Sequence, residues 1–235
     1  MAELSIVHLY PNTLRLNGEA GNVTALSVRA ASYGLKVKKT FVEIAQELPN
    51  KRPAIIFLGS GTLSATKLAA EDLISKSEII HSWVTQGTKV LAVGSGFDLI
   101  SQGLELLDGT FIAGLGLTNT THKIEAQHLV GEVVLSSGLA GFVNTNRSIR
   151  RGSGSFELGK VTASDLPELV GYVDGYSDGK VLASNVQGPL LPMNPKLADE
   201  LIAQLHPKLS KPSSLRKLDQ LAAKARAAIS TRVVR

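Results

Sequence analysis

Two segments of the chain pair an apolar run with a Gly-Ser-Gly turn, and this pairing restricts the fold more than any other feature of the sequence. The runs cover Ala54–Leu58 and Lys89–Val93, and the turns follow at Gly59–Gly61 and Gly94–Gly96. Short apolar runs of this kind are typical of parallel strands that helices cover on both faces. Helix-type segments follow each turn, so the sequence predicts an α/β fold: a doubly wound, mostly parallel sheet flanked by helices.

The remaining elements are predicted from local patterns. Asn22 is expected to cap a helix that ends at Gly34, where a left-handed glycine commonly terminates a helix. Residues Gly138–Ser155 are rich in Gly, Ser, Asn and Arg, a composition that favours a loop. Further strands are expected over Ser5–Tyr10, Lys36–Val42, Val130–Leu135 and Lys180–Ser184, and helices over Val23–Tyr33, Leu63–Ser75, Glu78–Thr85, the segment from Ser95 to about Leu106, and Lys196–Leu205.

The positive charge of the chain is concentrated at its end. The segment from Pro207 onward holds eight Lys or Arg residues and one acid, whereas the preceding 206 residues hold 17 basic and 19 acidic residues. We therefore predict two parts: a nearly neutral body, residues 1–206, and a basic linker with a short amphipathic helix, residues 207–235. That helix is either a solvated extension or a clamp on an acidic partner, nucleic acid or anionic membrane, with Leu215, Leu218 and Leu221 on its apolar face.

The chain has no cysteine, which excludes disulfides, thiolate metal sites and thiol nucleophiles. Its five histidines show no metal-ligand spacing, so we expect no metal and no cofactor. His8 falls in a predicted strand and is interpreted as structural, while His128 is kept as a site candidate. We find neither a secretory signal pattern nor an apolar run long enough to span a membrane, and we expect a cytoplasmic protein.

The two glycine turns allow more than one interpretation. Either turn could present backbone N–H groups to a phosphate, although neither completes Gly-x-Gly-x-x-Gly, or it could simply permit close packing. The turn at Gly94 also has the frame of a nucleophile elbow, the strand–turn–helix corner that exposes one reactive side chain. Gly94 itself has no side chain, and Ser95 is one residue late. A Ser95 nucleophile would need a base that the sequence does not place.

Several segments together carry a family resemblance. From Ile6 to Leu205 the chain resembles the cobyric acid synthase-like branch of class I glutamine amidotransferases, and most closely the glutaminase subunits of lipid II isoglutaminyl synthases. The carrying segments are Leu9–Pro11, Asn17–Val23, the turn at Gly94, Asp108-Gly109, Gly114–Leu117, Leu129–Gly131, Gly141–Asn144, Gly188–Pro195 and Leu197–Asp199.

The resemblance implies an amidotransferase site that lacks both of its catalytic side chains. Family members place a cysteine nucleophile where this chain has Gly94 and a histidine base where it has Gln187. The family's oxyanion and substrate pocket corresponds to Gly59, Gly61, Ser95 and His128, the last in place of an arginine. Glycine cannot act as the nucleophile and glutamine cannot act as the base, so no glutaminase activity is expected.

The implied role is that of a partner subunit for a MurT-like, Mur-ligase-family protein that amidates the D-glutamate of lipid II. Two alternatives stay open. The chain could be a non-catalytic binding or regulatory protein that uses the vacated pocket for a small ligand, or an enzyme with relocated chemistry at Ser95.

Overall fold

The computed structural model describes residues 2–234 of the 235, and its central element is a six-stranded sheet. The strand order is β11-β12-β4-β3-β1-β2, and every pair is parallel except β11 with β12. The strands are β1 (Glu3–Leu9), β2 (Lys36–Val42), β3 (Ile55–Leu58), β4 (Lys89–Val93), β11 (Tyr176–Ser177) and β12 (Val181–Ser184).

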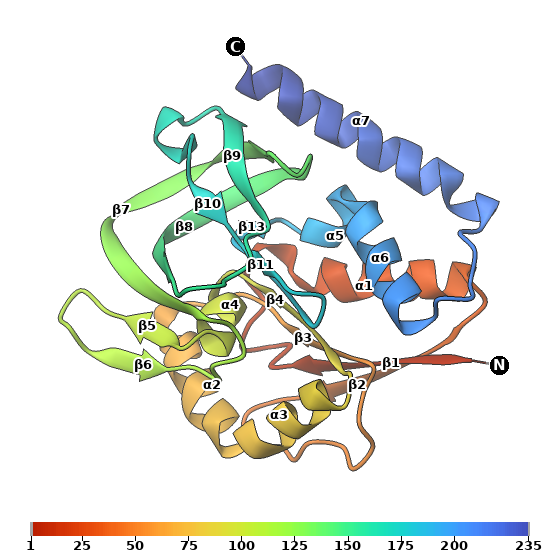
Figure 1. Ribbon diagram of the computed structural model, residues 1–235, viewed down its shortest axis with the longest axis horizontal. Coiled ribbons are helices and arrows are strands. Elements are labelled where there is room, and N and C mark those ends of the chain that lie inside the picture. Colours follow the sequence, from red (N-terminus) through yellow and green to blue (C-terminus); the bar gives the residue numbers. More distant parts are fainter. Residues whose placement is uncertain (1, 235) are drawn as a thin grey trace.

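Helices cover both faces of this sheet (Figure 1). Ile55 and Phe57 of β3 pack into the cluster formed with α1 (Ala20–Ser32) and α6 (Pro195–Leu205). Ile56 and Leu58, which alternate with them, pack into the cluster on the other face, which contains α2 (Leu63–Ser75), α3 (Ser77–Thr85) and α4 (Ser95–Ile100). Burial on both faces is the reason these runs are apolar throughout. The predicted doubly wound α/β fold is confirmed.

A second sheet of mostly antiparallel strands lies beside the first and was not predicted (Figure 1). It contains β5 (Gly103–Glu105), β6 (Phe111–Ala113), β7 (Thr120–Leu135), β8 (Ala140–Arg151), β9 (Gly159–Ser164), β10 (Val173–Asp174) and β13 (Val186–Gln187). The loop prediction for Gly138–Ser155 was wrong over β8. Pairing with β7 makes this segment a strand, although its polar composition suggested a loop.

Two other boundaries differ from expectation. The predicted helix through Leu106 ends at Ile100, because the Ser101 hydroxyl accepts the Gly103 N–H at 3.0 Å and Gly103, the first residue of β5, pairs with Ala113 of β6. Helix α1 begins at Ala20 rather than at Val23. Asn22 therefore lies inside the helix, where its Oδ1 accepts the Leu191 N–H at 2.8 Å.

The C-terminal segment forms α7 (Arg216–Val233), an 18-residue helix preceded by a 3-10 turn at Ser213–Leu215. Leu215, Ala222 and Ile229 are buried against the body, where α7 contacts β7, β8 and the short helix α5 (Leu190–Met193). Leu218 and Leu221 are exposed. Whether residues 1–206 and 207–235 are separable units stays a prediction.

Two short 3-10 turns, Leu16–Gly18 and Pro167–Leu169, complete the described chain. No helix between residues 2 and 234 is both long and apolar enough to cross a membrane.

Candidate functional site

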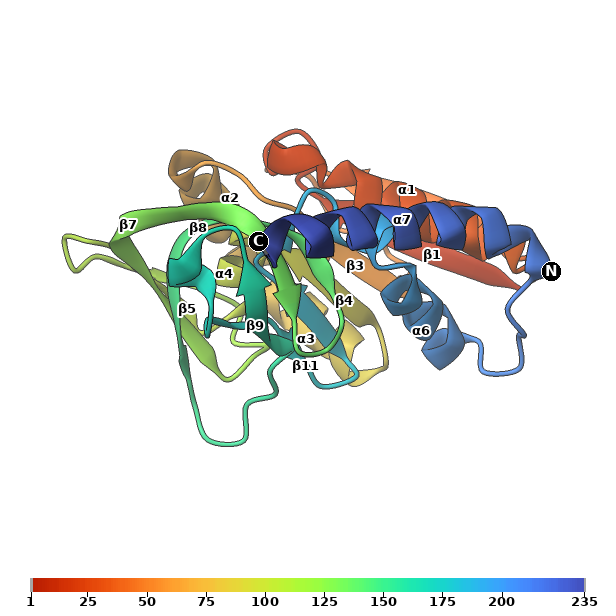
Figure 2. The same ribbon diagram turned by 90° about the horizontal axis from the view of Figure 1, so that it is seen from above.

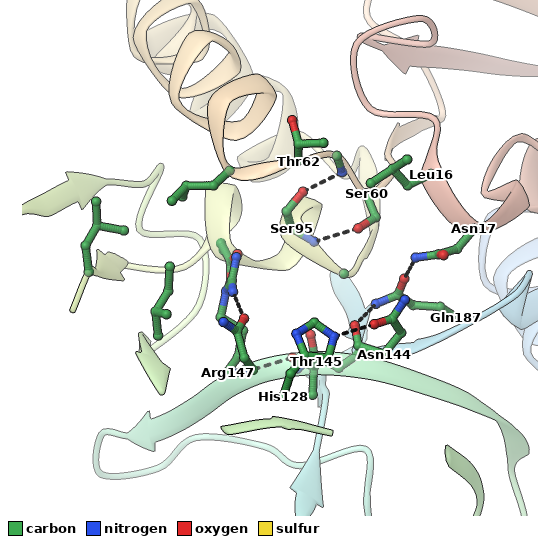
Figure 3. A pocket seen from close by; sticks show the side chains of 18 of the residues that line it. Leu16, Asn17, Ser60, Thr62, Ser95, His128, Asn144, Thr145, Arg147 and Gln187 are labelled. Atoms are coloured by element: carbon green, nitrogen blue, oxygen red, sulfur yellow. Dashed lines mark hydrogen bonds and ion pairs between the residues drawn. The ribbon is translucent and has the colours of Figure 1, made fainter. Parts of the chain in front are cut away.

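A pocket of about 600 Å³ lies where the carboxyl ends of β3 and β4 meet the second sheet (Figure 3). This is the edge at which α/β sheets bind ligands, because the turns after parallel strands converge there. The first sheet contributes the turns after β3 and β4, the 3-10 turn contributes Asn17, and the second sheet contributes its polar face. The lining includes Asn17, Ser60, Gly61, Gly94, Ser95, His128, Asn144, Thr145, Arg147 and Gln187.

Gly94 occupies the sharp corner between β4 and α4. Its φ of 58° and ψ of −125° form a conformation that L-residues rarely adopt. A β-carbon at position 94 would lie 2.5 Å from Ser60 Oγ, 2.7 Å from Ser60 Cβ and 3.0 Å from Gln187 Nε2. The elbow geometry is therefore present without a side chain, and Ser60 occupies the space that a side chain would need.

The hydroxyl groups of Ser60 and Ser95 also accept hydrogen bonds from backbone N–H groups of the two turns. The Ser95 N–H points to Ser60 Oγ at 3.4 Å, and the Gly61 N–H donates to Ser95 Oγ at 2.8 Å. Ser95 is only 5% exposed, and no histidine or carboxylate among the described residues hydrogen-bonds to its hydroxyl. This arrangement contains no base to activate Ser95 as a nucleophile.

The opposite wall of the pocket is a chain of side-chain hydrogen bonds (Figure 3). Asn17 Nδ2 donates to Gln187 Oε1, Gln187 Nε2 donates to the Asn144 carbonyl at 3.2 Å, and Asn144 Oδ1 lies 2.6 Å from His128 Nε2. Both ends of the Gln187 amide are therefore engaged. The Gln187 amide does not take up or release a proton near neutral pH, so Gln187 can orient a ligand but cannot act as the general base.

A buried charged cluster supports the wall from behind. His122 Nδ1 lies 2.7 Å from Asp98 Oδ1, and Arg147 Nε donates to Asp98 Oδ2 at 3.0 Å. The His122 ring is fully buried and stacks edge-on against Phe97, with 4.4 Å between ring centroids. Asp98 thus connects α4 to both β7 and β8, and it positions Arg147 at the pocket.

The structure brings five of the six predicted site residues together. Gly61, Gly94, Ser95, His128 and Gln187 line the same pocket. Gly59 instead lies behind it, where a β-carbon would be 2.4 Å from the Leu14 carbonyl oxygen. A glycine is therefore needed at position 59 for close packing against Leu14, which is one of the two interpretations left open for these turns.

Sequence reasoning missed Ser60, Asn17, Asn144, Arg147 and Asp98. Asn17 and Asn144 lie within segments that carry the family resemblance, and Ser60 lies in the predicted turn between Gly59 and Gly61, so their positions were available although their contacts were not. Arg147 and Asp98 gave no such signal, because they lie on β8 and α4, and these elements meet only in the folded structure. Within residues 2–234, no three His, Asp or Glu side chains gather as metal ligands would.

A buried carboxyl group lies next to the pocket. Glu19 is fully buried at the start of α1, where Asn22 Nδ2 donates to its Oε2 at 2.9 Å while Oε1 has no partner. Burial raises the pKa of Glu19 to about 8, and the Asn22 hydrogen bond only partly opposes this. Glu19 is therefore predominantly protonated at neutral pH.

The fold is similar to that of solved glutamine amidotransferases. The chain superposes on a crystal structure of a glutamine amidotransferase with a TM-score of 0.51 and 16% identity, covering 84% of this chain and 97% of that one. The glutaminase domain of Trypanosoma brucei CTPS, solved with bound acivicin, gives a TM-score of 0.50 and 12% identity, covering 89% and 96%. The fold is that of a glutamine amidotransferase.

Sequence comparison is more specific. Over 206 residues the chain is 25% identical to the lipid II isoglutaminyl synthase (glutamine-hydrolyzing) subunit GatD of Staphylococcus aureus, covering 86% of this chain and 84% of GatD. The GatD of Streptococcus pneumoniae is 27% identical over 208 residues, covering 85% and 79%. A scan against protein-family models gave no match. The predicted resemblance to class I amidotransferases of the GatD type is confirmed, while the cobyric acid synthase-like branch stays a prediction.

Proposed function

We propose that this chain is a GatD-like subunit of a lipid II isoglutaminyl synthase that does not itself hydrolyse glutamine. Similarity to two GatD proteins over most of their lengths supports the subunit role. In this role the chain acts in the cytoplasm as a heterodimer with a MurT-like, Mur-ligase-family subunit. That subunit amidates the D-glutamate of lipid II, and the amidotransferase-type subunit stabilises it or helps it to use free ammonia.

One observation carries the loss of glutaminase activity: the elbow has no side chain, and Ser60 occupies the space where one would stand. Hydrolysis of an amide through a covalent intermediate needs a nucleophile at the elbow and a base beside it. Gly94 and Gln187 hold these two positions, and they adjoin each other in the pocket. No cysteine elsewhere in the chain can replace the nucleophile.

The test measures glutamate release from glutamine by the purified chain, alone and with its ligase subunit. We expect no release above background, together with amidation of lipid II by the complex when ammonia is supplied. Clear glutamine turnover would overturn the loss of activity, and absence of any complex with the ligase would overturn the subunit role.

A second candidate function is non-catalytic ligand binding in the same pocket. The observation that favours it is the retained cavity of about 600 Å³, lined by amide and hydroxyl groups. A rise in melting temperature with glutamine, glutamate or a nucleotide, abolished by Asn144→Leu, would support it. Unchanged melting with all three would count against it.

A further inference from the structure

A second concave surface lies on the opposite side of α1 from the sheet. A groove of about 580 Å³ runs between α1 and α7, with Gly188–Pro195 as its floor. Figure 2 shows α7 extended alongside α1. Three large apolar side chains in its walls are open to solvent: Val28 is 47% exposed, Leu218 43% and Leu221 55%. Contiguous exposed apolar surface of this kind marks an interaction site.

A network of charged groups holds α7 against α1 and α6 and so fixes the two walls of the groove relative to each other. Arg29 donates to both carboxylate oxygens of Asp199, at 2.7 and 2.6 Å, and lies 2.9 Å from Asp219 of α7. Lys211 bridges the same two carboxylates at 2.9 and 2.6 Å. Arg226 of α7 also donates to the Met193 carbonyl at 2.5 Å. A preformed wall of this kind binds a partner with little loss of conformational entropy.

The shape and length of the groove fit a helix. Its walls are helices of 13 and 18 residues, which correspond to roughly 20 and 27 Å. A concave channel between two helices accepts the ridge of a third, whose apolar side chains recur at i, i+4 and i+7. A flat bilayer surface would reach the rims of such a channel but not its floor.

The charge around the groove indicates what kind of helix would bind there. Lys217 and Lys224 are exposed and lie seven residues apart, so they share one side of α7 beside Leu221. The one acid of α7, Asp219, is engaged by Arg29 and Lys211, and no acidic residue lines the groove as the structure describes it. A second copy of this chain would bring the lysines of two α7 helices together, so the charge favours an acidic partner.

We propose that this groove docks an amphipathic helix of a partner protein, with the apolar ridge of that helix in the groove and acidic side chains along the flank that faces α7. The proposal rests on the proposed function in taking the partner to be the ligase subunit. The groove and the amidotransferase-type pocket are separate surfaces, so the chain can use both together.

The first test measures binding of a fluorescein-labelled helical peptide of about 18 residues, with Leu at i, i+4, i+7 and i+11 and Glu on one flank. We expect the double variant V28E/L221E to weaken binding by about tenfold or more, because it places charges in the apolar contact. K217E/K224E should weaken it by about three- to tenfold and reduce its dependence on salt. Leu68→Glu is the matched control, since Leu68 is 55% exposed on α2, away from the groove, and should bind as the wild type does.

Four outcomes would overturn the proposal: no binding of the peptide to the wild type, equal binding of a twin peptide with Lys in place of Glu, a homodimer that V28E/L221E dissociates, or binding to anionic vesicles that the same variant abolishes. Melting curves establish that each variant is folded.

The second test measures the complex with the ligase subunit by sedimentation, using the same variants. Loss of the complex in V28E/L221E, but not in the Leu68→Glu control, supports the proposal. An intact complex in V28E/L221E overturns it and leaves the proposed function standing. If the wild type forms no complex with the ligase, the proposed function fails, and the peptide measurements alone decide whether the groove binds a helix.

Discussion

The contact between Ser60 and Gly94 leads to a quantitative prediction. Gly94→Ala adds one methyl group at a position with φ of 58°, where it would lie 2.5 Å from Ser60 Oγ and 2.7 Å from Ser60 Cβ. The backbone strain costs about 1–3 kcal/mol, and the overpacking adds about 1–3 kcal/mol. Because the Cβ of Ser60 is itself too close, rotation of the hydroxyl does not relieve the contact. We expect a loss of about 2–6 kcal/mol in the free energy of unfolding.

A double-mutant cycle separates the two causes. Ser60→Gly removes the contacting side chain and with it a long hydrogen bond of 3.4 Å to the Ser95 N–H, so by itself it should cost less than about 1 kcal/mol. In S60G/G94A the overpacking disappears and the strain remains. The two substitutions should therefore be coupled by about 1–3 kcal/mol.

The assay is urea unfolding at pH 7, followed by circular dichroism and fitted with a common m-value. Gly109→Ala is the matched control: Gly109 has a φ of 82°, and a β-carbon there would have no atom within 4 Å. It should show the strain without any coupling to Ser60. A coupling energy between Ser60 and Gly94 of less than about 0.5 kcal/mol would refute the assignment of Ser60 as the residue that fills the elbow.

Three further predictions concern the charged groups. Burial raises the pKa of Glu19 from 4.5 to about 8, so between these pH values the folded state keeps a proton that the unfolded state releases. The free energy of unfolding should therefore fall as pH rises from about 4.5 to 8, by an amount on the order of 5 kcal/mol. Glu19→Gln should flatten this slope in urea titrations across pH. Asp199→Asn removes one of two carboxylates from the buried Arg29 and should cost about 2–4 kcal/mol in the same unfolding measurement; a cost near zero would mean that the network does not hold α7. Arg232→Ala removes an exposed ion pair with Glu132 and should lower the melting temperature only slightly at low salt and leave it unchanged at high salt.

The contact between Ser60 and Gly94 also predicts whether glutamine hydrolysis can be restored by mutation. Restoring the family residues in G94C/Q187H should leave glutamine hydrolysis undetectable, because Ser60 still occupies the space of the new side chain. Because the wild type has no cysteine, the new thiol is the only one in the chain, and its rate of alkylation reports its exposure directly. S60G/G94C/Q187H should be alkylated faster than G94C/Q187H. Equal rates would contradict the steric role of Ser60.

Much of the first sheet was predictable from local sequence. The strands Lys36–Val42 and Lys89–Val93 and the helix Leu63–Ser75 were predicted with their observed bounds, because apolar runs, helical periodicity and glycine turns are short-range signals. The same signals located the turn that contains Gly94. The second sheet was missed where its strands are polar, as in β8, because that strand exists through pairing with β7 rather than through its own propensity.

The candidate site divides in the same way. Gly94 and Gln187 could be named from the sequence because Gly94 lies in a recognisable turn and Gln187 directly precedes the recognisable segment Gly188–Pro195. The absence of any cysteine showed that no other residue could be the thiol nucleophile. The sequence alone thus determined which chemistry the chain lacks. What occupies the vacated space depends on contacts between residues distant in sequence: Ser60 against Gly94, Asn17 against Gln187, and α7 against α1. Only the tertiary structure decided these, because side-chain packing across three dimensions leaves no periodic pattern along the chain.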